Sequence, residues 1–294
     1  MIEDTEMKTP NQQITKKQHH FPQMMLKRFL DDTNKIFMLD AQTGKINHQT
    51  TETVAYQNHL YTVHYAHGKD DGLEKKFSAI ESRAEDVLGR FLGSSNHDIE
   101  DCKFVLEFAV ILMIRTPKIV GIAENISKTE HMKETLLKRG SEKQISKEEI
   151  ESYISDLHEN KGFSYAATFS HSIADRLKLI TENFDAVVHT CSSDNVSFVV
   201  SDNYAVFEPL ENLQIEEGKN DWYNLPVHIH CPLAYNKCLC FTPKPNKNDK
   251  AAFNWSFAEV SEDHVNRVNQ LAFRQKERYL YSASIDQIKA LQKI

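Results

Sequence analysis

Three short polar segments carry the residue types that acid–base or metal chemistry needs. In the first, His19 stands three residues before Pro22, which disfavours helix in the residue before it, so the histidine lies on a turn. Histidine titrates near neutral pH and, when neutral, binds metal ions. His19 is therefore a candidate base or ligand. The alternative is that it caps the following helix or bonds nearby backbone groups.

The second segment is Ser201-Asp202-Asn203, which directly follows the apolar run Val196–Val200. A carboxylate at the end of a strand is held in place and stays accessible, as general acid–base or metal chemistry requires. We expect catalytic roles for Asp202 and Asn203, and substrate binding by Ser201. The same tripeptide also fits an ordinary Asx turn, in which the side chains bond their own backbone.

The third candidate is a pair of residues from two expected helices. Glu81 lies beside the apolar stripe of one helix, and Arg115 lies at the end of the next. A glutamate near the core costs free energy unless it is paired, so a buried contact between these two side chains is the structural interpretation. The catalytic interpretation joins Glu81, Asp202 and His19 in one hydrolytic site. There the two carboxylates hold a divalent metal ion or a water molecule, and His19 moves the proton.

Basic side chains at such a site neutralise the negative charge that develops on a phosphate group. We expect Arg115 in this role, with Lys27 and Arg28 as substrate-binding residues. The expected partners are then nucleic acid or a phosphorylated small molecule. No spacing in the sequence shows that these residues meet in space.

Two later segments alternate histidine or cysteine with apolar residues: His228 and His230 in one, Cys238 and Cys240 in the other. Alternate residues share one face of a strand, so a hairpin of the two could present a zinc-binding set. The C-x2-C spacing of zinc knuckles is absent, however, and buried thiols are common in strands. We therefore expect structural thiols and no bound zinc.

The hydrophobic pattern predicts the elements that position these residues. Helices are expected over residues 77–93, 99–115, 164–183, 262–281 and 286–293. Hairpins are expected from residues 35–40 with 45–46, from 184–190 with 196–200, and from 227–231 with 237–241. Helices gather in the middle and strands towards both ends, so the expected class is α+β, with a mixed or antiparallel sheet and a helical central section.

Charge divides the chain further. Residues 1–17 are polar and are expected to form a loose tail before a single domain over 18–294. Within that domain, 118–160 is expected to be a charged helical insertion, with a capping box that opens at Ser146. Six basic and six acidic residues balance between Lys128 and Glu151, which is typical of a solvated helical surface rather than a nucleic-acid patch.

The 294 residues include 35 basic and 42 acidic side chains, a net charge of −7. This excludes a protein coated with positive charge, although a local basic groove remains compatible with it. Five cysteines without a regular framework favour a reduced, intracellular protein. The polar start is no secretory signal, and the longest apolar run is too short to span a bilayer. We expect a cytoplasmic protein with no membrane partner.

Three stretches resemble, in order, motifs of the uncharacterised microbial family DUF4238, a domain of unknown function. Gln18–Phe29 is similar to QHxxPxxxLRxF, Phe198–Asn203 to FxxSDNP, and His230–Leu233 to a strand ending in Pro-Leu. The resemblance covers about Gln18 to Ser282. Lys27 stands where the family has arginine, and Tyr204 where it has proline. The family name implies a grouping and leaves the chemistry open.

Two function hypotheses follow. The first is a hydrolase-like enzyme, a phosphodiesterase or nuclease, for which a divalent metal ion is the candidate cofactor and Glu81 and Asp202 are the candidate ligands. A stress or defence setting is expected only from the kind of genes that orphan microbial proteins accompany. The alternative is a non-catalytic binding module that recognises a protein partner or a small ligand, with the charged helices of 118–160 as its contact surface.

Overall fold

The computed structural model describes residues 14–65, 68–94, 97–210, 227–244 and 252–294. Its central element is α3 (Ile99–Ile114), which is apolar on most sides and buried over most of its length. The amphipathic helix α2 (Gly72–Gly93) packs along α3 and ends at a glycine, as its stripe predicts. No helix among the described residues is long and apolar enough to cross a membrane.

The helices that follow α3 begin where a polar side chain caps the first turn, whereas the short helix Gln23–Leu26 follows Pro22 and has no side-chain cap. Thr116, Ser146, Asn160 and Ser261 each accept a hydrogen bond from a backbone N–H two or three residues into the helix that follows them. The expected capping box at Ser146 is confirmed. The helices are α1 (Gln23–Leu26), α4 (Pro117–Ser127), α5 (Glu130–Glu142), α6 (Lys147–Glu159), α7 (Lys161–Asn183), α8 (Glu262–Gln275) and α9 (Ile285–Leu291), with 3-10 turns at Lys27–Phe29 and Thr51–Thr53.

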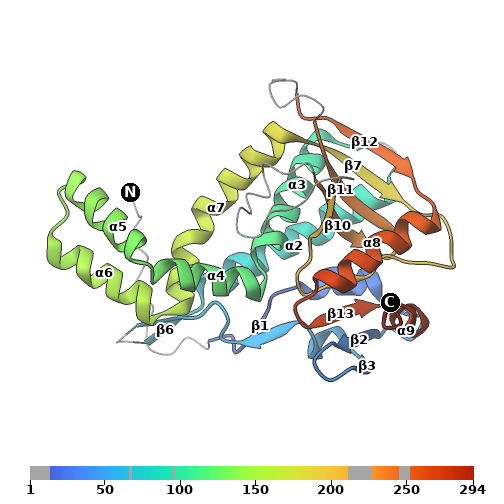
Figure 1. Ribbon diagram of the computed structural model, residues 1–294, viewed down its shortest axis with the longest axis horizontal. Helices are drawn as coiled ribbons and strands as arrows, with labels where there is room; N and C mark the ends of the chain where they lie inside the picture. Colours follow the sequence, from blue (N-terminus) through green and yellow to red (C-terminus); the bar gives the residue numbers. More distant parts are fainter. Residues whose placement is uncertain (1–13, 66–67, 95–96, 211–226, 245–251) are drawn as a thin grey trace.

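The larger sheet has five strands. In spatial order they are β12 (Trp255–Glu259), β7 (Phe184–Thr190), β11 (Lys237–Pro243), β10 (Val227–Ala234) and β9 (Val206–Pro209). All neighbours run antiparallel except β12 and β7, which are parallel. Apolar side chains of one sheet face join α2 and α3 in the main core. Figure 1 shows α8 beside β10 and β11. The helix α8 packs on the sheet face opposite to α2 and α3, where its His264 contacts His189 of β7.

The second sheet has four strands, and two short strand pairs lie apart from it. The four are β3 (Lys45–Gln49), β2 (Ile36–Asp40), β13 (Tyr279–Ser282) and β8 (Val200–Ser201). The pairs are β1 (Lys17–His19) with β4 (Tyr56–Asn58), and β5 (Val63–Tyr65) with β6 (Gly68–Asp70). This mixture of antiparallel sheets and grouped helices confirms the α+β class. The local hairpins β2–β3 and β10–β11 are confirmed as well.

Two predictions about the chain path are wrong. The helix expected over 262–281 ends at Gln275, and Tyr279–Ser282 is a strand. The reason is a remote carboxylate, Asp202, which binds the backbone N–H groups of the intervening turn. Residues 184–190 and 196–200 do not form a hairpin, because β7 pairs with β11 and β12. Val200 instead pairs with β13.

The region expected as a charged insertion forms α4 to α6, and Figure 1 shows α5 and α6 as an arm far from the five-stranded sheet. In α6 the side chains of Ile150, Ile154 and Leu157 are buried, and α4 supplies Val120 and Ala123 to a core cluster. The first thirteen residues of the expected tail lie outside the described residues. Thr15 donates its backbone N–H to Asp71, and the strand β1 follows at once. The division into tail, domain and insertion stays a prediction.

We predict that Gly162→Ala destabilises the protein by about 1–3 kcal/mol, the usual cost of forcing an extra methyl group into a packed site. A Cβ atom at Gly162, in the first turn of α7, would overlap the backbone of Thr62. The matched control is Gly89→Ala in α2, where no atom lies within 4 Å of the added carbon. That exchange should stabilise the protein by up to about 1 kcal/mol through helix propensity. Urea unfolding measures the stability of both variants. Equal changes in the free energy of unfolding would contradict the close packing of α7 on the backbone of Thr62.

Candidate functional site

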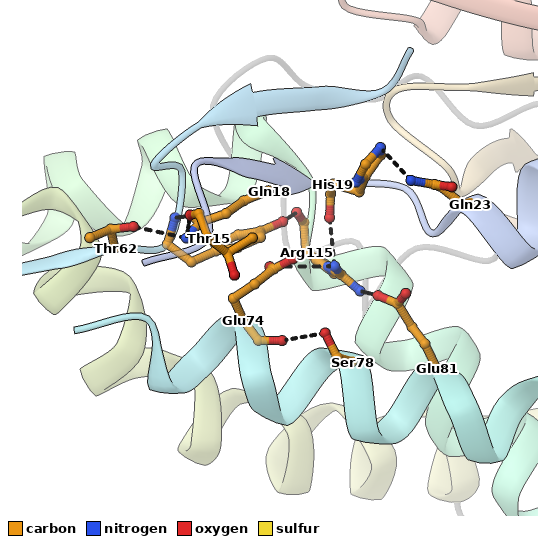
Figure 2. A network of polar contacts seen from close by, with 10 residues as sticks. Thr15, Gln18, His19, Gln23, Thr62, Glu74, Ser78, Glu81 and Arg115 are labelled. Atoms are coloured by element: carbon orange, nitrogen blue, oxygen red, sulfur yellow. Dashed lines mark hydrogen bonds and ion pairs between the residues drawn. The ribbon is translucent and has the colours of Figure 1, made fainter. Parts of the chain in front are cut away.

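Arg115, which directly follows α3, is the most enclosed charge of the predicted site. Its side chain is 1% exposed. One terminal nitrogen donates to a carboxylate oxygen of Glu81 on α2, and the other donates to the backbone oxygen of His19 at 2.6 Å (Figure 2). The guanidinium carbon also lies 4.1 Å from the ring centre of Phe77. We call Arg115, Glu81, His19 and the neighbouring Glu74 the Arg115 centre.

Glu74 is a second carboxyl group at this centre, and it was not among the candidates from sequence. Its Oε2 lies 3.9 Å from a terminal nitrogen of Arg115 and has no hydrogen-bond partner. Burial raises the pKa of Glu74 to about 7, and the charge of Glu81 adds to this while Arg115 opposes it. The spacing of Glu74, Phe77 and Glu81 places all three on one face of α2, which is the signal that could have identified it.

Backbone oxygen atoms around Arg115 are held by buried hydroxyl groups. Tyr61 donates to the backbone oxygen of Arg115 at 2.7 Å, and Tyr165 donates to that of Ile114 at 3.0 Å. Gln18 holds the same region from β1, because its amide accepts from the backbone N–H of Tyr61 at 2.6 Å and donates to the Thr62 hydroxyl at 2.8 Å (Figure 2). The glutamine of the first motif thus positions the segment that covers Arg115.

The imidazole of His19 points away from Arg115, although the backbone oxygen of His19 accepts a hydrogen bond from the guanidinium of Arg115 (Figure 2). Its Nε2 lies 3.2 Å from the side-chain nitrogen of Gln23, and its ring centre lies 5.7 Å from that of Tyr56. Burial lowers the pKa of His19 to about 4, with Arg115 adding to the shift, so the half-buried ring is neutral at neutral pH. The adjacent His20 is buried more deeply, and burial lowers its pKa to about 3.

The tripeptide Ser201-Asp202-Asn203 belongs to a different network. The carboxylate of Asp202 accepts from the backbone N–H groups of residues 277, 278 and 279 at 3.0, 2.8 and 2.9 Å. Asn203 donates its side-chain amide to the backbone oxygen of Gln275 at 3.1 Å. Burial raises the pKa of Asp202, and the three backbone bonds oppose that shift. This arrangement, which we call the Asp202 turn, connects β8 to the chain that follows α8.

The two motif segments are neighbours even so. The ring of Phe21, inside the first motif, and that of Tyr204, directly after the second, have centres 5.5 Å apart. The structure therefore brings His19, Glu81 and Arg115 together, and places Asp202 and Asn203 nearby with their hydrogen bonds directed elsewhere. Lys27 is exposed, and Arg28 donates to the backbone oxygen of Glu85 on α2 at 3.5 Å. Neither contributes a contact to Arg115.

The chain as a whole can now be placed among known proteins. Residues 17–286 match the model of a family described as protein of unknown function, DUF4238. The chain belongs to the DUF4238 family. No curated protein and no solved structure matches it. The resemblance that the ordered motifs predicted is thus confirmed.

The family motifs acquire physical roles in this DUF4238 protein. The first motif supplies Gln18 and the backbone of His19 to the Arg115 centre. The second supplies Asp202 to the turn after α8. Glu81 and Asp202 are thus held in separate hydrogen-bond networks, so the geometry offers no support for one metal ion between them. Among the described residues, the side chains that come together as metal ligands are His189, His230 and Cys240.

We predict that Glu74→Gln removes a pH dependence of stability. A carboxyl whose pKa is 4.5 when exposed and about 7 when buried binds more protons in the folded state between these values, so folding stability falls as pH rises through that window. The full difference is about 3 kcal/mol, and the glutamine, which resembles the protonated acid, lacks it.

Urea unfolding at pH 5 and pH 8 measures this difference for the wild type and the variant. Glu107→Gln, at an exposed position of α3, is the matched control and should behave as the wild type does. Parallel pH profiles for wild type and Glu74→Gln would contradict the assignment of Glu74.

We also predict that Asp202→Asn destabilises the protein by about 2 kcal/mol, because its amide replaces one of the two oxygens that accept backbone N–H groups. The matched control is Asp194→Asn, at an exposed position between β7 and β8. It should change the free energy of unfolding by less than about 0.5 kcal/mol. Thermal or urea unfolding distinguishes the two. A neutral Asp202→Asn would show that the turn does not depend on the carboxylate.

Proposed function

We propose that the chain is a hydrolase-like enzyme whose acid–base chemistry takes place at the Arg115 centre. The observation that carries the proposal is the second carboxyl group. Glu81 already neutralises the guanidinium, so a structural ion pair has no need of Glu74, whose burial costs free energy. The centre also keeps a buried donor, Arg115 Nε, and a buried acceptor, Glu74 Oε2, without hydrogen-bond partners.

The two carboxyl groups suit different roles. Glu74, with a pKa of about 7, can hold a proton and release it near neutral pH, as a general acid must. Glu81 is the carboxylate in direct contact with Arg115, and its side chain is 23% exposed against 11% for Glu74, so it is the more accessible of the two carboxyl groups. Two carboxyl groups in contrasting environments are the pattern by which many hydrolases divide acid and base. The neutral, half-buried ring of His19 points away from Arg115, so His19 contributes its backbone oxygen to the centre.

The charge of the centre narrows the substrate class. Arg115 and Glu81 cancel each other, and Glu74 is partly protonated at neutral pH, so no positive charge is left over for an anion. A phosphodiester would have to displace Glu81 from the guanidinium, without help from Lys27 or Arg28. This balance supports an uncharged carboxylic ester or amide more than the phosphodiesterase or nuclease reaction expected from sequence.

The helices α4 to α6 favour a second candidate function. Several apolar side chains are exposed along α4, α6 and the turn between α5 and α6: Ile122, Ile126, Ile145 and Tyr153. Exposed apolar side chains mark a protein-binding surface where they gather into one patch, and the helices α4, α5 and α6 that carry or adjoin these four contact one another. In this alternative the chain is a binding module, and the Arg115 centre is structural.

We predict that Glu74→Gln and Glu81→Gln each lower the rate of ester hydrolysis by 10²–10⁴-fold, the usual loss when a general acid or base is removed. The assay uses chromogenic carboxylic esters and, in parallel, a chromogenic phosphodiester. The wild-type rate should fall as pH rises above about 7, because Glu74 then loses the proton that it donates. Circular dichroism confirms that each variant is folded.

Glu107→Gln serves again as the control and should keep the full rate. Equal rates in all three variants, or a wild type that hydrolyses none of these compounds, would contradict the proposal and favour the binding module.

A further inference from the structure

A cluster of histidines lies on the face of the five-stranded sheet that α8 partly covers (Figure 1). His189 comes from β7, His230 from β10 and His264 from α8, and the ring centres of His189 and His264 are 4.6 Å apart. Cys240 of β11 is paired with His230 across the sheet, and Cys238 is paired with His189. Because paired and alternate residues share a face, His189, His230 and Cys240 all point to the same side.

The ligand atoms of His189, His230 and Cys240 lie within 4.8 Å of one another. Ligands about 2.0–2.3 Å from a tetrahedral zinc ion stand roughly 3.5 Å apart, so small side-chain rotations would bring these three into range. Two imidazoles and a thiolate form a donor set that suits a borderline or soft divalent ion such as Zn²⁺, rather than Mg²⁺ or Ca²⁺.

Glu208 sets the hydrogen position on His230. Its Oε2 lies 2.8 Å from Nε2 of His230, and a carboxylate can only accept, so Nε2 carries the hydrogen and Nδ1 carries a free lone pair. Glu208 is held in turn by Arg267 of α8 at 2.7 Å. Metal-binding histidines are oriented in this way, by a carboxylate on the ring nitrogen opposite the ion.

One ring nitrogen of His230 and one of His189 are buried without a hydrogen-bond partner. His230 is 1% exposed, and its Nδ1 has no hydrogen-bond partner. The Nδ1 of His189 is buried without a partner as well. Buried polar atoms without partners cost free energy, and a bound cation would satisfy both rings at once.

We infer that His189, His230 and Cys240 bind one divalent transition-metal ion, and that Glu208 is the positioning residue for His230. Binding replaces the thiol proton of Cys240, which is released to solvent, by a bond from the thiolate to the ion. Three protein ligands leave one position open, as in catalytic zinc sites. The ring centre of His264 lies 4.6 Å from that of His189, and Arg267 donates to Nδ1 of His264 at 3.1 Å, which leaves its Nε2–H buried without an acceptor.

This inference departs from the expectation of no bound zinc, which rested on the missing C-x2-C spacing. It also differs from the set considered there, because His228 and Cys238 are not in the cluster of ligand atoms. The inferred site is independent of the Arg115 centre and of the reaction proposed for it.

The test is a titration of the full chain, freed of metal by chelation and without a histidine tag, with Co²⁺. We expect one equivalent to bind with a thiolate-to-cobalt charge-transfer band in the near ultraviolet, and Zn²⁺ to displace it. Cys240→Ala should lose the band. Cys238→Ala, two residues away on the same strand and equally buried, is the matched control and should keep both band and stoichiometry. Glu208→Gln should bind cobalt 10- to 100-fold more weakly and show the same band at saturation.

Circular dichroism checks the folding of each variant. If Cys240→Ala does not fold, His189→Gln, at a half-buried position, replaces it and should weaken cobalt binding at least tenfold. A wild type that binds less than stoichiometric cobalt, or binds it without the charge-transfer band, would overturn the inference. So would a band that survives in Cys240→Ala, or one that disappears equally in Cys238→Ala.

Discussion

The buried charge of Arg115 is the constraint on which the N-terminal half of the molecule depends. A guanidinium that is 1% exposed must find acceptors inside the protein, because an unpaired buried charge would cost several kcal/mol. The acceptors come from two directions, a carboxylate on α2 and the backbone of β1. The hydrogen bonds of the Arg115 guanidinium thereby hold α2 against the end of α3 and hold the first motif beside both helices. Tyr61 then holds the backbone of Arg115 itself.

The contact between Glu81 and Arg115 could be predicted because each residue stands beside an apolar stripe, where a charge needs a partner. Glu74 could have been found in the same way, from its spacing with Phe77 and Glu81. The role of Asp202 could not. Its partners are backbone N–H groups 75 to 77 residues away, and every residue except proline carries such a group, so nothing in the sequence marks them.

The same distinction explains the sheets. The strands of the hairpins β2–β3 and β10–β11 follow each other directly in the sequence, so the residues between them are enough to predict each turn. The partners of β7 and β8 lie 47 residues or more further along the chain, and alternation of apolar residues indicates a strand without naming its neighbour. His189 was not considered beside His230 and Cys240 for this reason. His189 and His230 come together only because β11 lies between their strands, and spacing rules for zinc knuckles do not describe ligands gathered by sheet register.

The Arg115 centre and the histidine cluster both join a buried nitrogen group to a glutamate, yet they pose opposite problems. Arg115 offers hydrogens, which carboxylates and backbone oxygens from many parts of a chain can accept. His230 uses its one hydrogen on Glu208 and is left with a lone pair, and Nδ1 of the neighbouring His189 is buried without a hydrogen-bond partner. A lone pair in a protein interior needs a donor or a cation, and donors on a sheet face are scarce because the backbone N–H groups are used in the ladder. A buried donor can therefore be a purely structural element, whereas the lone pair of His230 and the unpartnered nitrogen of His189, both beside a thiol, can be satisfied together by one metal ion.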